Sequence, residues 1–195
     1  SANKIIQIIE NTYNIKDGKE RAYYSLLKYQ LLFRKNRINK NVHVEDSLIN
    51  YSISYYSDNE DARKLALSYY LKGRMSKEKD AIRYFKKAEF TVQKTDNNFL
   101  KMRIFNCIAL ANLKNEDYKT GLKFGLKSIK YGQKANDTET LIWCYLTVSD
   151  LYGYIHKPDS CIFFANKCID YLDKVPLAQK ASIYINVAAA IENTD

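Results

Sequence analysis

The chain has 195 residues and a formal net charge of +9, and its 46% apolar and 27% charged residues are ordinary for a soluble globular protein. Six Gly and two Pro provide few of the breaks that a sheet of short strands needs, so helices are expected. No apolar run is long enough for a transmembrane helix, no signal peptide is visible, and the four cysteines form no CxxC pair.

Apolar periodicity and capping residues predict about ten helices and therefore an all-α fold. In chain order the expected helices are 3–13, 17–35, 45–57, 61–76, 79–95, 98–114, 117–135, 138–155, 158–173 and 177–193. The segments DNED, TDNN, NED and ANDTE precede four of them, and Asp and Asn at such places accept the N–H groups of a first turn. Pro158 and Pro176 lie near helix starts, where a missing N–H costs nothing.

One helical pattern returns every forty residues, in DAIRYFKKAEF (80–90), TGLKFGLKSIK (120–130) and SCIFFANKCID (160–170). Small residues coincide at two places, aromatic residues at a third and Lys at a fourth. These sets are Ala81, Gly121 and Cys161; Ala88, Ser128 and Cys168; Tyr84, Phe124 and Phe164; and Lys87, Lys127 and Lys167. Phe85, Gly125 and Ala165 also align but differ in size. Small side chains on one helical stripe let a neighbouring helix approach closely.

The preceding helices repeat as well. Phe105 aligns with Tyr145 at forty residues, and Tyr69 aligns with Phe105 at thirty-six. The repeating unit is therefore a pair of antiparallel helices, and stacked units of this length predict an α-solenoid. We expect a single solenoid domain, 1–195, with units at 17–57, 61–95, 98–135 and 138–173, a partial unit at 177–193 and an N-terminal helix at 3–13.

These units resemble the tetratricopeptide repeat, which places large, small and aromatic residues at fixed positions of two helices. The matching residues are Tyr145, Val148, Ser149, Tyr152, Cys161, Ala165 and Cys168; Phe105, Ile108, Ala109, Asn112, Gly121, Gly125 and Ser128; and Tyr69, Gly73, Ala81, Phe85 and Ala88. Asn112 departs from the Tyr of the family, and the first of these units is four residues shorter. The resemblance covers about residues 20–193 and implies a right-handed α-solenoid that binds a protein or a peptide.

The order DSLINYSISYYSDNEDARKLALSYYLKGR, followed by AIRYFKKAEF, also resembles tetratricopeptide proteins of Bacteroidetes-type bacteria, many of them proposed transcriptional regulators. In that set the repeats often precede a transmembrane helix, a coiled coil and a helix-turn-helix domain, none of which is present here. The resemblance implies the sensing or interaction region of a membrane-associated regulator with repeats outside the cytoplasm; a cytoplasmic location is the alternative. Membrane attachment would then depend on parts absent from this chain.

The last expected helix looks like the first helix of a further unit without its partner. We therefore expect the chain to be a fragment of a longer regulator. The apolar face of this helix, formed by Ile183, Val187, Ala190 and Ile191, is expected to lack cover on one side. Self-association through that face is a second way in which the chain could find a partner.

In the tetratricopeptide family, repeat positions 2, 5, 9 and 12 of the first helices line a groove that holds a peptide. The corresponding residues are Leu67, Tyr70 and Arg74; Arg103, Asn106, Leu110 and Leu113; and Trp143, Leu146, Asp150 and Gly153. Trp143, the single Trp of the chain, is an expected anchor for a protein partner, and packing against the next helix is its alternative role. Arg74, Arg103 and Asn106 could hold a carboxylate of that partner.

Most basic residues fall on the second helices, at Lys86, Lys87, Lys94, Lys123, Lys127, Lys130, Lys134 and Lys167. We interpret them as a solvated outer wall, because the aromatic residues between them belong to the packing frame. Binding of nucleic acid or another polyanion through these lysines is the alternative function.

No sequence motif supports an enzyme. His43 and His156 lack a partner at metal-ligand or catalytic spacing, and no glycine-rich phosphate loop is present. A metal site of His156, Cys161 and Cys168 is conceivable, but both cysteines occupy positions where other units have Ala, Gly or Ser. We therefore expect them to pack between helices, and we expect no cofactor.

Overall fold

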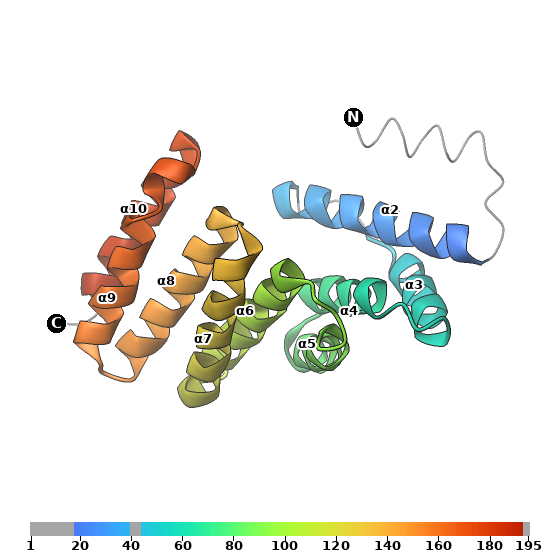
Figure 1. Cartoon of the computed structure of the whole chain (residues 1–195), viewed down its shortest axis with the longest axis horizontal. Coiled ribbons are helices and arrows are strands. Elements are labelled where there is room, and N and C mark those ends of the chain that lie inside the picture. The colour runs from blue at the N-terminus through green and yellow to red at the C-terminus, as the bar shows by residue number, and fades with distance from the viewer. Residues whose placement is uncertain (1–17, 40–43, 193–195) are drawn as a thin grey trace. The chain divides into compact units, whose positions relative to one another are not determined.

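The structure is a computed structural model that describes residues 18–39 and 44–192, apart from the side chains of Ala178 and Ala190 (Figure 1). Its internal contacts divide the chain into two compact units, Ser1–Thr95 and Asp96–Asp195. This division coincides with the boundary that the sequence predicts between the helix pairs 61–95 and 98–135.

The described part of the chain is all-helical, with nine α-helices, one short 3-10 helix and no strand, which confirms the all-α part of the expected fold. The first unit contains α2 (Lys19–Ile38), α3 (Asp46–Asp58), α4 (Ala62–Met75) and α5 (Glu78–Val92). The second contains α6 (Asn98–Lys114), α7 (Tyr118–Ala135), α8 (Thr138–Tyr154), α9 (Pro158–Ile169), η1 (Leu172–Lys174) and α10 (Leu177–Glu192). The expected helix 3–13 and His43 lie outside the described residues. No helix within 18–39 and 44–192 is long and apolar enough to cross a membrane.

Capping explains why four of these helices begin where the sequence predicts. In each case an Asp or Asn side chain accepts a hydrogen bond from the backbone N–H three residues later. This N–H lies in the first turn and has no acceptor within the helix. The pairs are Asp61 with Lys64 (3.0 Å), Asn97 with Leu100 (3.0 Å), Asp117 with Thr120 (3.1 Å) and Asp137 with Thr140 (3.1 Å). Pro158 occupies the first turn of α9.

The helices pack in adjacent pairs, and the same packing order occurs in each unit (Figure 1). In the first unit α2 packs with α3 and α4 with α5, and α4 also contacts both helices of the preceding pair. In the second unit α6 packs with α7 and α8 with α9, and α8 also contacts both α6 and α7. The single helix α10 contacts α8 and α9 in the same way. Each unit is therefore built from repeated helix pairs.

Small residues of α7 allow this helix to pack closely against its neighbours in the second unit. Gly121, Gly125, Ser128 and Gly132 are all buried along one stripe of this helix. A Cβ atom on Gly125 would lie 2.7 Å from Cγ2 of Val148, and one on Gly132 would lie 2.8 Å from Cδ1 of Leu141. These glycines thus allow α7 and α8 to approach closely, as the repeating small residues predict.

The size mismatch at Phe85 is compensated on the facing helix. A Cβ atom on Gly73 of α4 would lie 2.7 Å from the Phe85 ring, so Gly73 leaves the space that the ring fills. The equivalent residues of the next pair are Ala109 and Gly125, where the larger side chain is on the first helix. The space beside Gly125 is instead filled by Val148 of α8, since a Cβ atom on Gly125 would lie 2.7 Å from Val148 and 3.8 Å from Ala109.

Buried cysteine and serine side chains join α8 to α9. Cys161 and Cys168 have no exposed surface, in agreement with their expected packing role. Oγ of Ser149 donates to the carbonyl oxygen of Cys161 (2.8 Å), and the Cys168 thiol lies 3.7 Å from the carbonyl oxygen of Ile142. The chain leaves α9 at Ile169, earlier than expected, and the following turn places Leu172 in the core.

The expectation that Ile183 and Val187 lack cover is wrong. They are only 1% and 4% exposed and belong to the core of the second unit, and Ile191 packs against that core. The side chain of Ala190 lies outside the described part. The exposed large apolar residues of α10 are instead Leu177, Tyr184 and Ile185, at 83%, 53% and 69%. The helix is apolar on several faces, so periodicity alone does not determine which face is buried.

Candidate functional site

The first helices α6 and α8 of the second unit carry most of the residues expected to contact a partner. Along α6 these are Arg103, Asn106, Leu110 and Leu113, and along α8 they are Trp143, Leu146 and Asp150. Steps of three and four residues place each set on one helical face. Because α6 and α8 contact each other, the two sets form one candidate surface, which we call the groove face.

On α6, the groove face combines apolar and polar groups. Leu110 is 37% exposed, Leu113 and Arg103 are half-buried, and the Arg103 guanidinium lies 5.2 Å from the centre of the Phe99 ring. Asn106 is buried, and its Oδ1 atom has no hydrogen-bond donor among the described residues. An enclosed acceptor without a donor costs about 1–3 kcal/mol, and a donor from a partner would reduce that cost.

On α8, Trp143 is 37% exposed, whereas Leu146 is buried in the core. Asp150 is half-buried, and this burial raises the pKa of its carboxyl group because it disfavours the charged form. The groove face therefore presents one partly exposed indole, a partly exposed leucine and a carboxyl group held away from bulk water.

The three expected contact residues of the first unit behave differently. Tyr70 is 1% exposed and belongs to the core, while Leu67 is half-buried. Arg74 is exposed, and its Nη1 donates to the Tyr70 hydroxyl (3.0 Å) while the guanidinium lies 5.4 Å from the centre of the Phe33 ring. Arg74 thus serves the packing of its own unit, and Tyr70 offers almost no surface to a partner.

Four of the eight lysines assigned to the second helices, Lys87, Lys94, Lys127 and Lys167, lie over aromatic rings of their own unit. The Lys87 ammonium is 5.5 Å from the centre of the Tyr69 ring, and that of Lys127 is 5.6 Å from the centre of the Phe105 ring. Lys167 pairs with Asp170 at 3.0 Å. Within the described ranges, no three His, Cys, Asp or Glu residues come together in a metal-binding group.

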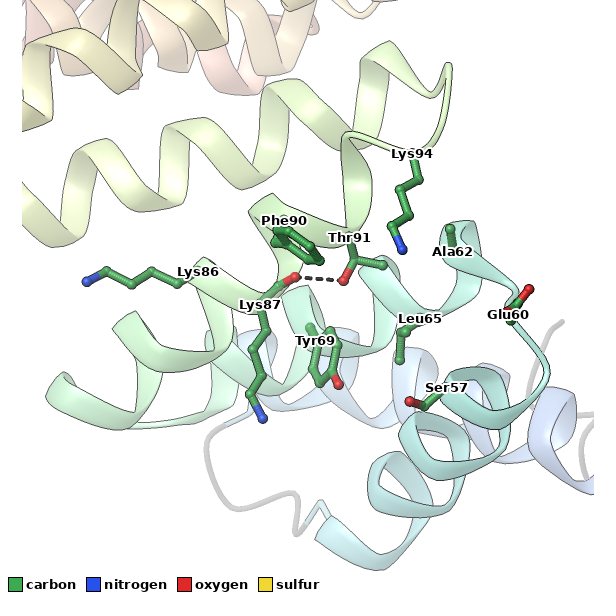
Figure 2. A pocket seen from close by; sticks show the side chains of 10 residues that line it. All are labelled: Ser57, Glu60, Ala62, Leu65, Tyr69, Lys86, Lys87, Phe90, Thr91 and Lys94. Carbon is green, nitrogen blue, oxygen red and sulfur yellow. Dashed lines mark hydrogen bonds between the residues drawn. The ribbon is translucent and has the colours of Figure 1, made fainter.

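The structure also has a hollow that the sequence prediction missed (Figure 2). It measures about 740 Å³ and lies in the first unit, between the end of α3, one side of α4 and α5 with the turn that follows it. Its lining residues are Ser57, Glu60, Ala62, Leu65, Tyr69, Lys86, Lys87, Phe90, Thr91 and Lys94. The available signal was a break in the forty-residue repeat, since Thr91 aligns with Tyr131 and Tyr171.

Comparisons of the chain with known protein families and with characterised proteins find no match.

Proposed function

We propose that the chain is a right-handed α-solenoid of the tetratricopeptide type that binds a protein or peptide without catalysing a reaction. We further propose that it is the sensing or interaction region of a bacterial transcriptional regulator. The partly exposed Trp143 and Leu110 on two contacting first helices are the observation that carries the binding proposal. The sequence resemblance described above supports the regulator role.

Binding at the groove face would combine an apolar anchor with polar orientation. Burying the remaining surface of an indole and a leucine provides the main favourable free energy, since large side chains in a water-free contact dominate protein interfaces. Backbone N–H groups of a bound peptide would supply donors for the Asn106 amide and the Asp150 carboxyl group. The partner expected from this chemistry is a short segment with an apolar side chain and free N–H donors.

Selection from a random peptide library on the full chain tests this function. We expect enriched peptides whose affinity falls by more than about tenfold in the Leu110→Ala/Trp143→Ala double variant. Phe163 is a matched control, because it is an aromatic residue 55% exposed on the second helix α9. Phe163→Ala is expected to leave the affinity unchanged. Equal loss in both variants, or no enriched peptide, would contradict the proposal.

Polyanion binding through the lysines of the second helices is the alternative function. Its support is the net charge of +9 together with the rows of Lys on α5 and α7. Phosphate contacts release counterions, so the affinity for an oligonucleotide would fall steeply with salt. A filter-binding series in rising salt distinguishes this function from groove binding.

Self-association is a further proposal for the partner, and the exposed Leu177 and Ile185 of α10 support it. Sedimentation at several concentrations would then show a dimer that Ile185→Lys removes. Identical sedimentation of both proteins as monomers would exclude this partner.

A further inference from the structure

Three aromatic rings fill the same place in two helix pairs of the second unit. The Phe105 ring lies between Phe124 (centres 6.0 Å apart) and Tyr131 (5.4 Å). Forty residues later, the Tyr145 ring lies between Phe164 (6.3 Å) and Tyr171 (5.9 Å). A tyrosine at the end of the second helix, or just after it, therefore covers the central ring in both pairs.

The pair α4–α5 lacks the third ring. Tyr69 and Tyr84 occupy the first two places, with centres 6.4 Å apart. The third place belongs to Thr91, whose short side chain turns back and donates to the carbonyl oxygen of Lys87 (2.8 Å; Figure 2). The hollow of about 740 Å³ has both Tyr69 and Thr91 in its lining. It therefore opens at the place where the equivalent pairs hold a tyrosine ring.

The lining of the hollow combines apolar residues with positive charge. Its apolar residues include Ala62, Leu65 and Tyr69 of α4 and Phe90 of α5, and Phe90 is 72% exposed (Figure 2). The charged lining residues are Lys86, Lys87, Lys94 and Glu60, which gives three positive charges against one negative charge. The Lys94 ammonium lies 5.6 Å from the centre of the Phe90 ring, so charge and aromatic surface are adjacent.

We propose that this hollow binds an acidic peptide segment of a protein partner by taking up one of its aromatic side chains. The ring of the partner would lie against Tyr69, where Tyr131 and Tyr171 lie against the equivalent rings. Carboxylates next to that ring in the partner would pair with Lys86 and Lys94. The lining residues belong to the first unit, and none of them belongs to the groove face.

The lining favours a peptide over a nucleotide. The two equivalent pairs fill the corresponding space with a phenol ring on a polypeptide, which favours a tyrosine side chain as the occupant. Adenine edges are read mostly by Asn or Gln, and guanine edges by Arg or Lys. The hollow has no Asn, Gln or Arg side chain in its lining, and the Thr91 hydroxyl donates to the carbonyl oxygen of Lys87 in its own helix. Its three Lys side chains can pair with the carboxylates of a peptide as well as with phosphates, so the space equivalent to a tyrosine ring is the feature that favours a peptide.

The test uses the full chain and a fluorescein-labelled peptide Asp-Glu-Tyr-Glu-Asp, with fluorescence anisotropy as the readout. Thr91→Tyr fills the hollow from inside, so we expect the affinity to fall by about tenfold, the loss expected for a ring that can no longer be buried. Thr91→Val keeps the space open and is expected to bind as the natural chain does. The probe with Ala in place of Tyr has the same charge and is expected to bind about tenfold more weakly.

Two further measurements make the result decisive. Thermal unfolding shows whether Thr91→Tyr is folded, and we expect a midpoint no lower than that of the natural chain. Lys86→Glu/Lys94→Glu changes only exposed residues and is also expected to weaken binding by about tenfold or more. Equal affinity for the Tyr and Ala probes would overturn the proposal. Undiminished affinity of the Thr91→Tyr variant or of the Lys86→Glu/Lys94→Glu variant would also overturn it.

Preferential binding of pentathymidylate at the same site would overturn the choice of a peptide. Leu110→Ala/Trp143→Ala is expected to bind the probe normally, because its changes lie on the groove face of the other unit. Loss of peptide binding at the groove face and loss of probe binding at the hollow can therefore be distinguished.

Discussion

Gly125 sets the distance between α7 and α8, because the facing Val148 leaves no room for a Cβ atom. That atom would lie 2.7 Å from Cγ2 of Val148, whose branched side chain is held in one rotamer within a helix. We therefore expect Gly125→Ala to lower the free energy of unfolding by about 1–2 kcal/mol despite the higher helix propensity of Ala. Urea denaturation followed by circular dichroism measures this change.

Gly153 is the matched control for Gly125. A Cβ atom there would be 3.8 Å from the Cys161 sulfur, which is an ordinary contact. Gly153→Ala is expected to raise the free energy of unfolding by about 0.5 kcal/mol or more, since Ala is the better helix former. Stabilisation of the chain by both substitutions would contradict a steric limit at Gly125.

The buried thiols of Cys144 and Cys168 predict a loss of stability at alkaline pH. Burial raises the pKa of each thiol from 9.0 to about 12. Between these values the unfolded chain loses the thiol protons while the folded chain keeps them. The unfolded state then binds fewer protons, so the free energy of unfolding falls as pH rises through this range.

Urea midpoints at about pH 8 and about pH 10.5 test this prediction, because only the higher value lies between the two thiol pKa values. The Cys144→Ala/Cys168→Ala variant should lose less stability between these conditions than the natural chain. A decline of the same size in both proteins would show that other groups are responsible.

At the scale of the element, side-chain caps fix where the helices begin. Oδ1 of Asp117 accepts from the N–H of Thr120 at the start of α7. Asp117→Ala should therefore lower the free energy of unfolding by about 0.5–2 kcal/mol in urea denaturation. Lys157 occupies the same position before α9 but makes no side-chain cap, so Lys157→Ala serves as the control. A similar small effect of both changes would exclude capping as a source of stability.

The helices and their starts were predictable because the signals are local. Asp and Asn caps, small residues at i and i+7, and the forty-residue repeat all act within one or two helices. The burial of Ile183 and Val187 was not predictable, because α10 has apolar residues around most of its circumference. The contact of the small Gly73 with the large Phe85 was also not predicted, because the sequence alone does not show that these two residues face each other.

The candidate site was predictable in part. Repeat positions selected residues on α6 and α8, and of these Trp143 and Leu110 are partly exposed. The same positions in the first unit selected Tyr70, which the structure buries, because family positions do not determine how tightly a given unit packs. The hollow beside Thr91 could have been predicted only from a departure from the repeat, because Tyr131 and Tyr171 occupy the equivalent positions.

At the scale of the whole molecule, the two compact units predict that the second can fold by itself. The core around Met102, Tyr145 and Ile183 is formed within this unit. We expect a fragment of residues 96–195 to be helical by circular dichroism, to unfold cooperatively and to bind a groove-selected peptide as the full chain does. A fragment without cooperative unfolding would show that this core depends on the preceding residues.

The most direct test of the account uses Trp143, the only Trp in the chain, as a probe of the groove face. Titration of the full chain with a peptide selected on it should shift the indole emission to shorter wavelength, because binding removes water from the ring. The shift should saturate at the same peptide concentration as binding measured independently. A peptide that binds with full affinity while the Trp143 emission stays unchanged would contradict a binding site on α6 and α8.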